Sequence, residues 1–80
     1  MFEKTIMLRS FEDVKKFVDI ASSKSYEVDL ISGKYVVNAK SIMGVFSLDL
    51  TKPLVVKAYC ENNAEIARQL EPFSKEQRSK

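Results

Sequence analysis

The side chains that could do chemistry in this chain are few, and their types exclude more than they suggest. Histidine is absent from all 80 residues, which removes imidazole acid–base catalysis, phosphohistidine formation and the commonest transition-metal ligand. Cys60 is the only cysteine, so no internal disulfide and no standard zinc site can be built. We therefore expect no catalytic constellation, no metal and no cofactor, and we predict that the chain is not an enzyme.

Ser41 is the hydroxyl whose surroundings carry the most information. It stands immediately before a short apolar run, and this position predicts the N-cap of a short helix. Helical spacing would place three apolar side chains on one face: Ile42, Val45 and Leu48. Met43 and Phe46 would lie on a second face, which so short a helix in a small chain cannot also bury. Met43 and Phe46 are therefore candidates for an exposed apolar patch that marks a partner surface, and the alternative is that they belong to the core.

Four strands are predicted from the alternation of apolar and polar residues. They lie at residues 2–8, 26–30, 35–38 and 54–59. The last run is rich in β-branched residues, which suits an interior strand. Gly33 can adopt positive φ, so it predicts a tight turn between the second and third strands.

Two further helices are predicted on either side of the Ser41 segment. The first begins after Ser10, with Asp13 as a weak capping partner, and its apolar stripe consists of Val14, Phe17, Val18 and Ala21. The last begins at Asn62, with Glu65 as its capping partner, and ends near Pro72. The resulting order β-α-β-β-α-β-α predicts an α+β fold, in which helices cover one face of an antiparallel sheet.

The positive net charge is confined to the end of the chain. Residues 1–73 hold ten Lys or Arg against ten Asp or Glu, and the excess lies in residues 74–80. We predict a single domain over 1–73, followed by a basic, disordered tail over 74–80. A neutral body argues against nucleic acid as the partner. No signal peptide or membrane-spanning run is present, so we expect a cytoplasmic monomer.

The segment around Ser41 resembles, nearly residue for residue, the regulatory-serine segment of HPr, the phosphocarrier of the bacterial sugar phosphotransferase system, in its Gram-positive form. The matching run is Lys40-Ser41-Ile42-Met43-Gly44-Val45. The predicted order of elements also fits the HPr-like open-faced β-sandwich from about residue 2 to residue 73. The resemblance implies that an HPr kinase/phosphorylase modifies Ser41. It also implies a patch that docks the kinase, a catabolite-control regulator or phosphotransferase-system components, formed by Lys40, Ile42, Met43 and Phe46.

One part of the family pattern is missing. HPr carries a His-x-Arg-Pro motif at the start of its first helix, where the histidine relays a phosphoryl group. The corresponding residues here are Arg9-Ser10-Phe11-Glu12, so the nucleophile is absent and a carboxylate stands close to any incoming phosphate. We predict an HPr-like protein that has lost the relay and acts as a regulatory or adaptor protein. The alternative is an HPr-fold interaction module with an unrelated protein or RNA partner.

Overall fold

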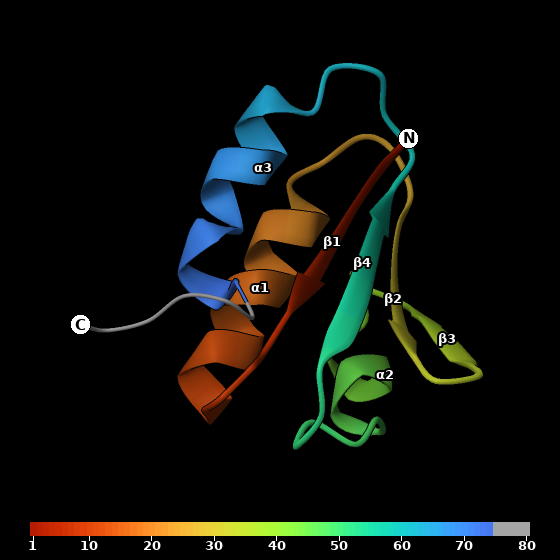
Figure 1. Ribbon diagram of the computed structural model, residues 1–80, viewed down its shortest axis with the longest axis vertical. Helices are drawn as coiled ribbons and strands as arrows, with labels where there is room; N and C mark the ends of the chain where they lie inside the picture. The colour runs from red at the N-terminus through yellow and green to blue at the C-terminus, as the bar shows by residue number, and fades with distance from the viewer. Residues whose placement is uncertain (75–80) are drawn as a thin grey trace.

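The computed structural model describes residues 1–74 and arranges them as one antiparallel sheet with helices on one of its faces (Figure 1). The strands are β1 (Phe2–Ile6), β2 (Val28–Ser32), β3 (Tyr35–Asn38) and β4 (Leu54–Ala58). The helices are α1 (Phe11–Ser22), α2 (Ile42–Phe46), α3 (Ala64–Gln69) and the 3₁₀ turn η1 (Glu71–Phe73). The predicted order of elements and the α+β class are confirmed. Apart from Ser74, the predicted tail lies outside the described residues.

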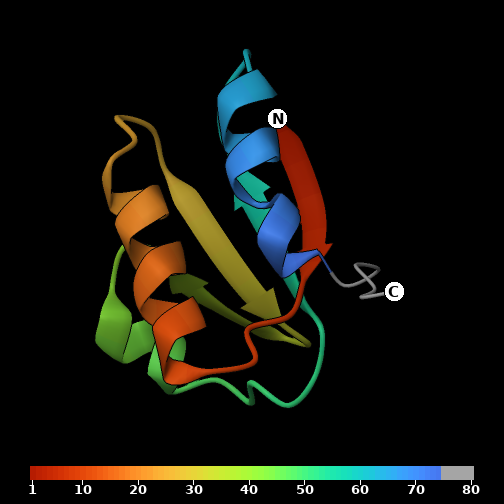
Figure 2. The same cartoon turned by 90° about the vertical axis from the view of Figure 1, so that its left-hand side faces the viewer.

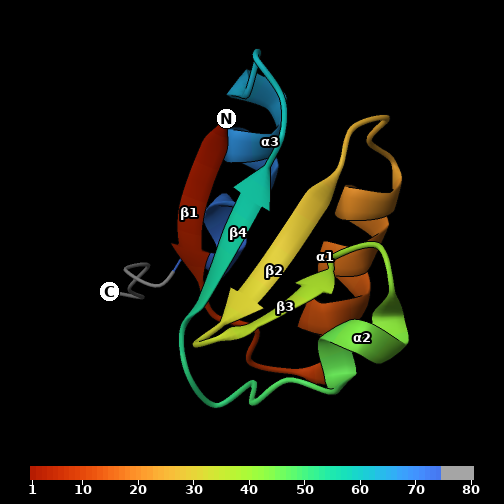
Figure 3. The ribbon, with the colours of Figure 1, turned by 90° about the vertical axis from the view of Figure 1, so that its right-hand side faces the viewer.

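The strands follow the order β1-β4-β2-β3 across the sheet, and all neighbouring pairs are antiparallel (Figure 3). β4 is therefore an interior strand, as its valine-rich sequence predicts. Its alternate residues Leu54, Val56 and Ala58 are fully buried, because a strand side chain points to the opposite face from its neighbour. Gly33 has φ 61° in the two-residue connection between β2 and β3, which confirms the predicted turn.

The core lies between the sheet and the helices α1 and α3, which stand side by side on one face (Figure 2). The predicted stripe of α1 is buried in full: Val14, Phe17, Val18 and Ala21. Phe17 meets Phe73 edge to face, with ring centroids 6.5 Å apart. Each fully buried side chain of this size contributes roughly 1.5–3 kcal/mol to stability. None of the helices within residues 1–74 has the length and apolar character needed to cross a membrane.

Several predicted boundaries differ from the structure: β1 ends at Ile6 rather than at residue 8, β2 ends at Ser32 rather than at residue 30, and β4 ends at Ala58 rather than at residue 59. β2 also begins at Val28 rather than at residue 26, because its pairing with β4 starts at Val28, opposite Ala58. Before that point the Glu27 carbonyl accepts from the Tyr59 amide at 3.0 Å. The capping pair predicted for α3 does not form. The Asn62 side chain instead accepts a hydrogen bond from the Ala64 amide at 3.2 Å, a local turn that asparagine readily makes, and the N-cap is Asn63.

Candidate functional site

Ser41 caps α2 as predicted. Its backbone is extended, with φ −102° and ψ 110°, and its Oγ accepts a hydrogen bond from the Gly44 amide at 3.1 Å. The lack of a side chain at Gly44 permits this close contact, because a Cβ at that position would lie 3.3 Å from Ser41 Oγ and 3.5 Å from Val37 Cβ. The side chain of Ser41 is exposed, so an enzyme could reach the hydroxyl without opening the fold.

The exposure expected of the residues after Ser41 is confirmed for two of them. Met43 is 77% exposed and Phe46 is 39% exposed. The predicted inward face is only partly correct, because Val45 alone is fully buried while Ile42 is exposed and Leu48 is half-buried. The reason is the position of α2, which packs beside α1 and β3 rather than across the sheet (Figure 3). A helix at that edge can seat a single side chain in the core.

Phe11 extends this exposed surface, and sequence reasoning missed it. Its ring stacks on Phe46 with centroids 5.4 Å apart and planes 17° apart, yet it stays 60% exposed. The Lys15 ammonium lies 5.6 Å from the Phe11 centroid, within reach of a cation–π interaction. The available signal was an aromatic residue at the first helical position, outside the buried stripe of α1. We call the exposed residues Phe11, Ile42, Met43 and Phe46 the apolar patch.

Lys40, which the sequence places beside Ser41, is engaged elsewhere. Its ammonium donates a hydrogen bond to the Lys24 carbonyl at 2.9 Å, in the loop that follows α1. Its backbone amide donates to Asn38 Oδ1 at 2.8 Å. Because the side chain is half-buried and its ammonium is bound, Lys40 ties the start of α2 to the end of α1. Its charge is therefore not available to the apolar patch in this arrangement.

The four residues at the position of the missing relay motif form the start of α1. Ser10 is the N-cap, and its Oγ accepts from the Asp13 amide at 3.1 Å. The Asp13 carboxylate in turn accepts from the Arg9 amide at 3.0 Å. Glu12 adds a second carboxylate to the first turn. The Asp13 and Arg9 amides are thus already bonded to the chain's own oxygens, and two negative charges stand where an anion would approach.

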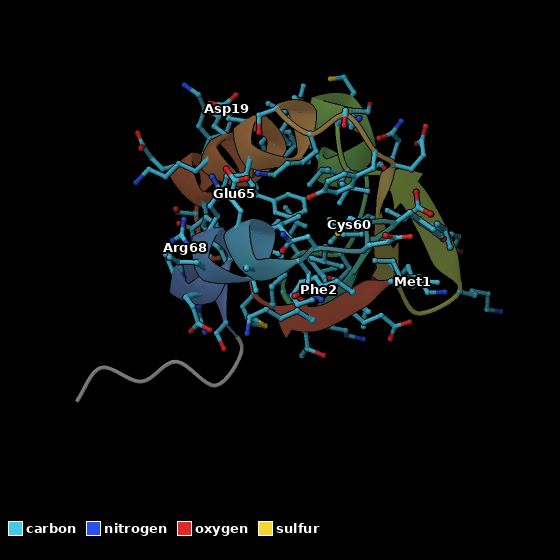
Figure 4. The ribbon with its side chains drawn as sticks, turned by 90° about the horizontal axis from the view of Figure 1, so that it is seen from above. Met1, Phe2, Asp19, Cys60, Glu65 and Arg68 are labelled. Atoms are coloured by element: carbon cyan, nitrogen blue, oxygen red, sulfur yellow. The ribbon has the colours of Figure 1, made fainter. Side chains whose placement is uncertain are left out.

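Cys60 lies on the connection from β4 to α3 and is half-buried (Figure 4). Burial raises the pKa of the neighbouring Tyr26 hydroxyl to about 12, and its hydrogen bond with Cys60 acts in the same direction. Glu65, on the side of α3 that faces α1 (Figure 4), lies 3.7 Å from the Lys24 ammonium. Within residues 1–74 no three side chains of the metal-ligating types gather into a site.

Three comparisons with known proteins bear on this arrangement. The family described as PTS HPr component phosphorylation site matches residues 13–74, a span that contains α2 and begins just after the start of α1. The crystal structure of HPr-C-His from Thermoanaerobacter tengcongensis is similar, with a TM-score of 0.74 and 28% sequence identity. The superposition covers 88% of this chain and 86% of that one. No curated protein sequence matches the chain.

Proposed function

The chain belongs to the HPr family, and on this premise we propose that it is a regulatory or adaptor protein of the phosphotransferase system that does not carry phosphohistidine. Members of this family are phosphocarriers rather than enzymes and interact with phosphotransferase-system proteins. The observation that carries the proposal is which residues stand at the start of α1 and how they are hydrogen-bonded. The sequence holds no histidine, the Ser10 and Asp13 oxygens accept from the Asp13 and Arg9 amides, and Glu12 and Asp13 make the first turn acidic.

Ser41 is the proposed site of regulation, by a kinase of the HPr kinase/phosphorylase type. Three features support it: the matched Lys40–Val45 run, the exposed hydroxyl and the absence of acidic residues from the first turn of α2. A phosphate there would bring about −1.5 to −2 charges at pH 7. The oxygen that caps the Gly44 amide would be retained by the ester, so the local fold has no reason to open.

The apolar patch is the proposed docking surface for that kinase and for a catabolite-control regulator or phosphotransferase components in the cytoplasm. A phosphate on Ser41 would stand at its border. A partner that buries Met43 and Phe46 must then either desolvate the phosphate, at a cost of several kcal/mol, or offer Arg or Lys to it. Modification would therefore select between partners rather than switch the fold.

The stack of Phe11 on Phe46 favours a second candidate, an adaptor whose protein partner lies outside the phosphotransferase system. The resemblance predicts Arg at position 11, and a charged guanidinium and an exposed aromatic ring suit different partners. An RNA partner has no such support, because residues 1–73 are neutral overall.

The test is incubation with a Gram-positive HPr kinase and ATP, followed by mass mapping of phosphorylated peptides. We expect phosphate on Ser41 and none on Ser10, the matched N-cap serine of α1. Ser41→Ala should remove the signal. In a parallel reaction, phosphoenolpyruvate and enzyme I should leave no acid-labile phosphate on the chain. Phosphate absent from Ser41, or an acid-labile adduct mapped to the start of α1, would overturn the proposal.

A further inference from the structure

The two edge strands of the sheet, β1 and β3, differ in whether another segment of the chain covers them. The β1 edge is covered at its end by the C-terminal segment: the Met7 amide donates to the Phe73 carbonyl at 2.8 Å, and Ile6 pairs with Ser74. β3 forms the opposite edge, and no described strand lies beyond it (Figure 3). An uncovered edge strand can template the addition of another strand.

The register of the hairpin identifies the backbone groups at this edge. The Ala39 amide, just after β3, donates to the Val28 carbonyl at 2.8 Å. Val37 lies two residues before Ala39 and faces Leu30 in β2. Hydrogen-bonded pairs alternate in an antiparallel ladder, so Val36 and Asn38 direct their backbone groups away from β2. The Asn38 carbonyl accepts from Ser41. Val36 is left with both a donor and an acceptor for another strand, and Asn38 with a donor.

A groove of about 940 Å³ runs beside this edge. One wall is the hairpin from Ser32 to Val37, and the other is the segment after α2 with Leu48 and Pro53. Tyr35 is 67% exposed and Val36 is 58% exposed. The strand therefore combines free backbone groups with apolar contacts, which is the combination that strand addition requires.

The charges along the groove indicate what would fit it. Lys34 and Lys52 line it, and neither has a carboxylate within 4.0 Å among residues 1–74. Asp49 is the acidic residue of the lining, but its carboxylate accepts from the Thr51 amide and hydroxyl at 3.1 and 2.6 Å. These hydrogen bonds lower the pKa of Asp49, and the nearby charge of Lys52 acts in the same direction. Neither ammonium group forms a salt bridge within residues 1–74, so both can pair with a carboxylate from outside.

We propose that β3 and this groove bind an extended acidic segment of a partner protein, which adds to the sheet as a further strand. Its alternate apolar side chains would contact Tyr35 and Leu48, and its carboxylates would pair with Lys34 and Lys52. A second copy of this chain fits less well, because β3 itself has no acidic residue and would bring another Lys34 to a groove already holding two lysines. The inference does not depend on the proposed function, since it uses neither the apolar patch nor Ser41 phosphorylation.

The test is titration of the ¹⁵N-labelled full chain with an acetylated, amidated hexapeptide of alternating glutamate and valine. Amide shifts should concentrate on Lys34, Val36 and Asn38. A hexapeptide of alternating lysine and valine should bind much more weakly, and so should the acidic peptide N-methylated at every residue, which has no backbone N–H left to pair with an edge strand. Equal binding of the basic peptide, shifts confined to the apolar patch, or no shift at β3 would each overturn the proposal.

Variants separate charge from strand pairing. Lys34→Glu and Lys52→Glu should each weaken binding about fivefold, the range of a surface ion pair, while Lys16→Glu makes the same charge change on α1 and should have no effect. Val36→Pro removes an outward N–H without removing a ladder bond and should abolish binding while the β2 amides stay unshifted. Sedimentation of the chain without peptide tests for self-association. A dimer whose formation shifts the Val36 amide would assign the β3 edge to a second copy of the chain and overturn the proposal.

Discussion

The starts of α1 and α2 use the same cap and differ in nearly everything around it. Ser10 and Ser41 each accept a hydrogen bond at 3.1 Å from the amide three residues on. The first turn of α1 then carries Glu12 and Asp13, whereas that of α2 carries no acidic residue. Because two carboxylates stand in the first turn of α1, they repel a further anion, and we call Ser10 the closed cap. The start of α2 is open to an anion.

The two helices also differ in how they are held. α1 has 12 residues and buries four side chains, while α2 has five residues and buries Val45 alone. α1 is thus a structural element that is held by its buried stripe and begins at the Ser10 cap. α2 is a short element that presents most of its surface to solvent. The comparison teaches that two helix starts with the same kind of cap can differ in the charge around it, since the first turn of α1 is acidic and that of α2 is not.

The largest expected effect tests how α2 is anchored. Val45→Ala should lower the free energy of unfolding by about 2 kcal/mol, because it removes two buried methyl groups and leaves a cavity. Met43→Ala, two residues away, should cost about 0.5 kcal/mol or less. Denaturant midpoints measured at unchanged m-value decide the matter. A large loss for Met43→Ala would place Met43 in the core and remove it from the apolar patch.

The next effect compares the two caps directly. Ser10→Ala and Ser41→Ala should each cost about 1 kcal/mol, the usual contribution of an N-cap side chain. At α1 part of the loss should be offset, since the Asp13 carboxylate still binds the Arg9 amide at 3.0 Å. Urea titration of both variants measures the difference. If Ser10→Ala proved harmless while Ser41→Ala was costly, the bond from Asp13 would be the effective cap of α1.

The elements of this fold could be predicted from sequence because each has a local cause. The stripe of α1, the valine-rich run of β4 and the positive φ of Gly33 are properties of neighbouring residues. The start of α3 could not be predicted in the same way. Two asparagines stand there, and the competition between a capping box and a local turn was decided by Asn62 binding Ala64.

The candidate site was predicted less completely, since its contacts join residues far apart in the chain. Nothing local indicates that Phe11 will stack on Phe46, because their separation depends on how α1 packs against α2. The same holds for the bond from the Lys40 ammonium to the Lys24 carbonyl. Ser41, whose cap is formed with Gly44 three residues away, was placed correctly for that reason.

A smaller effect is expected when a charge is placed at the open cap. Ser41→Asp should keep the thermal midpoint within about 3 °C of the parent chain, because aspartate is an equally good N-cap and favours the helix dipole. The affinity of a partner bound to Met43 and Phe46 should change, and calorimetry can measure both quantities. Ser10→Asp is the matched variant at the closed cap, where the neighbouring Glu12 and Asp13 should make the same charge less favourable. Equal responses at both caps would remove the contrast between them.

The smallest expected effect concerns the pKa of Tyr26, two residues after Lys24, whose carbonyl binds the Lys40 ammonium. We expect Ser41→Asp to leave this pKa unchanged. Burial raises the pKa of Tyr26 to about 12 from an ordinary value of 10.0. A group whose pKa is raised on folding contributes stability that is complete below its unfolded pKa. This contribution is therefore lost as the pH rises from about 10 through about 12. The ultraviolet absorbance of tyrosinate, with Tyr26→Phe to assign the transition, gives the pKa directly.

Ser41→Asp should leave that transition in place. The Lys40 ammonium binds the loop that leads to Tyr26, through the Lys24 carbonyl at 2.9 Å. If the new carboxylate drew Lys40 away, the loop would loosen, water would reach Tyr26 and its pKa would fall toward its ordinary value. Lys40→Met reports the effect of losing the link without adding a negative charge. A fall in Ser41→Asp that matches the fall in Lys40→Met would show that the start of α2 is coupled to the end of α1, so that a charge on Ser41 acts beyond its own helix.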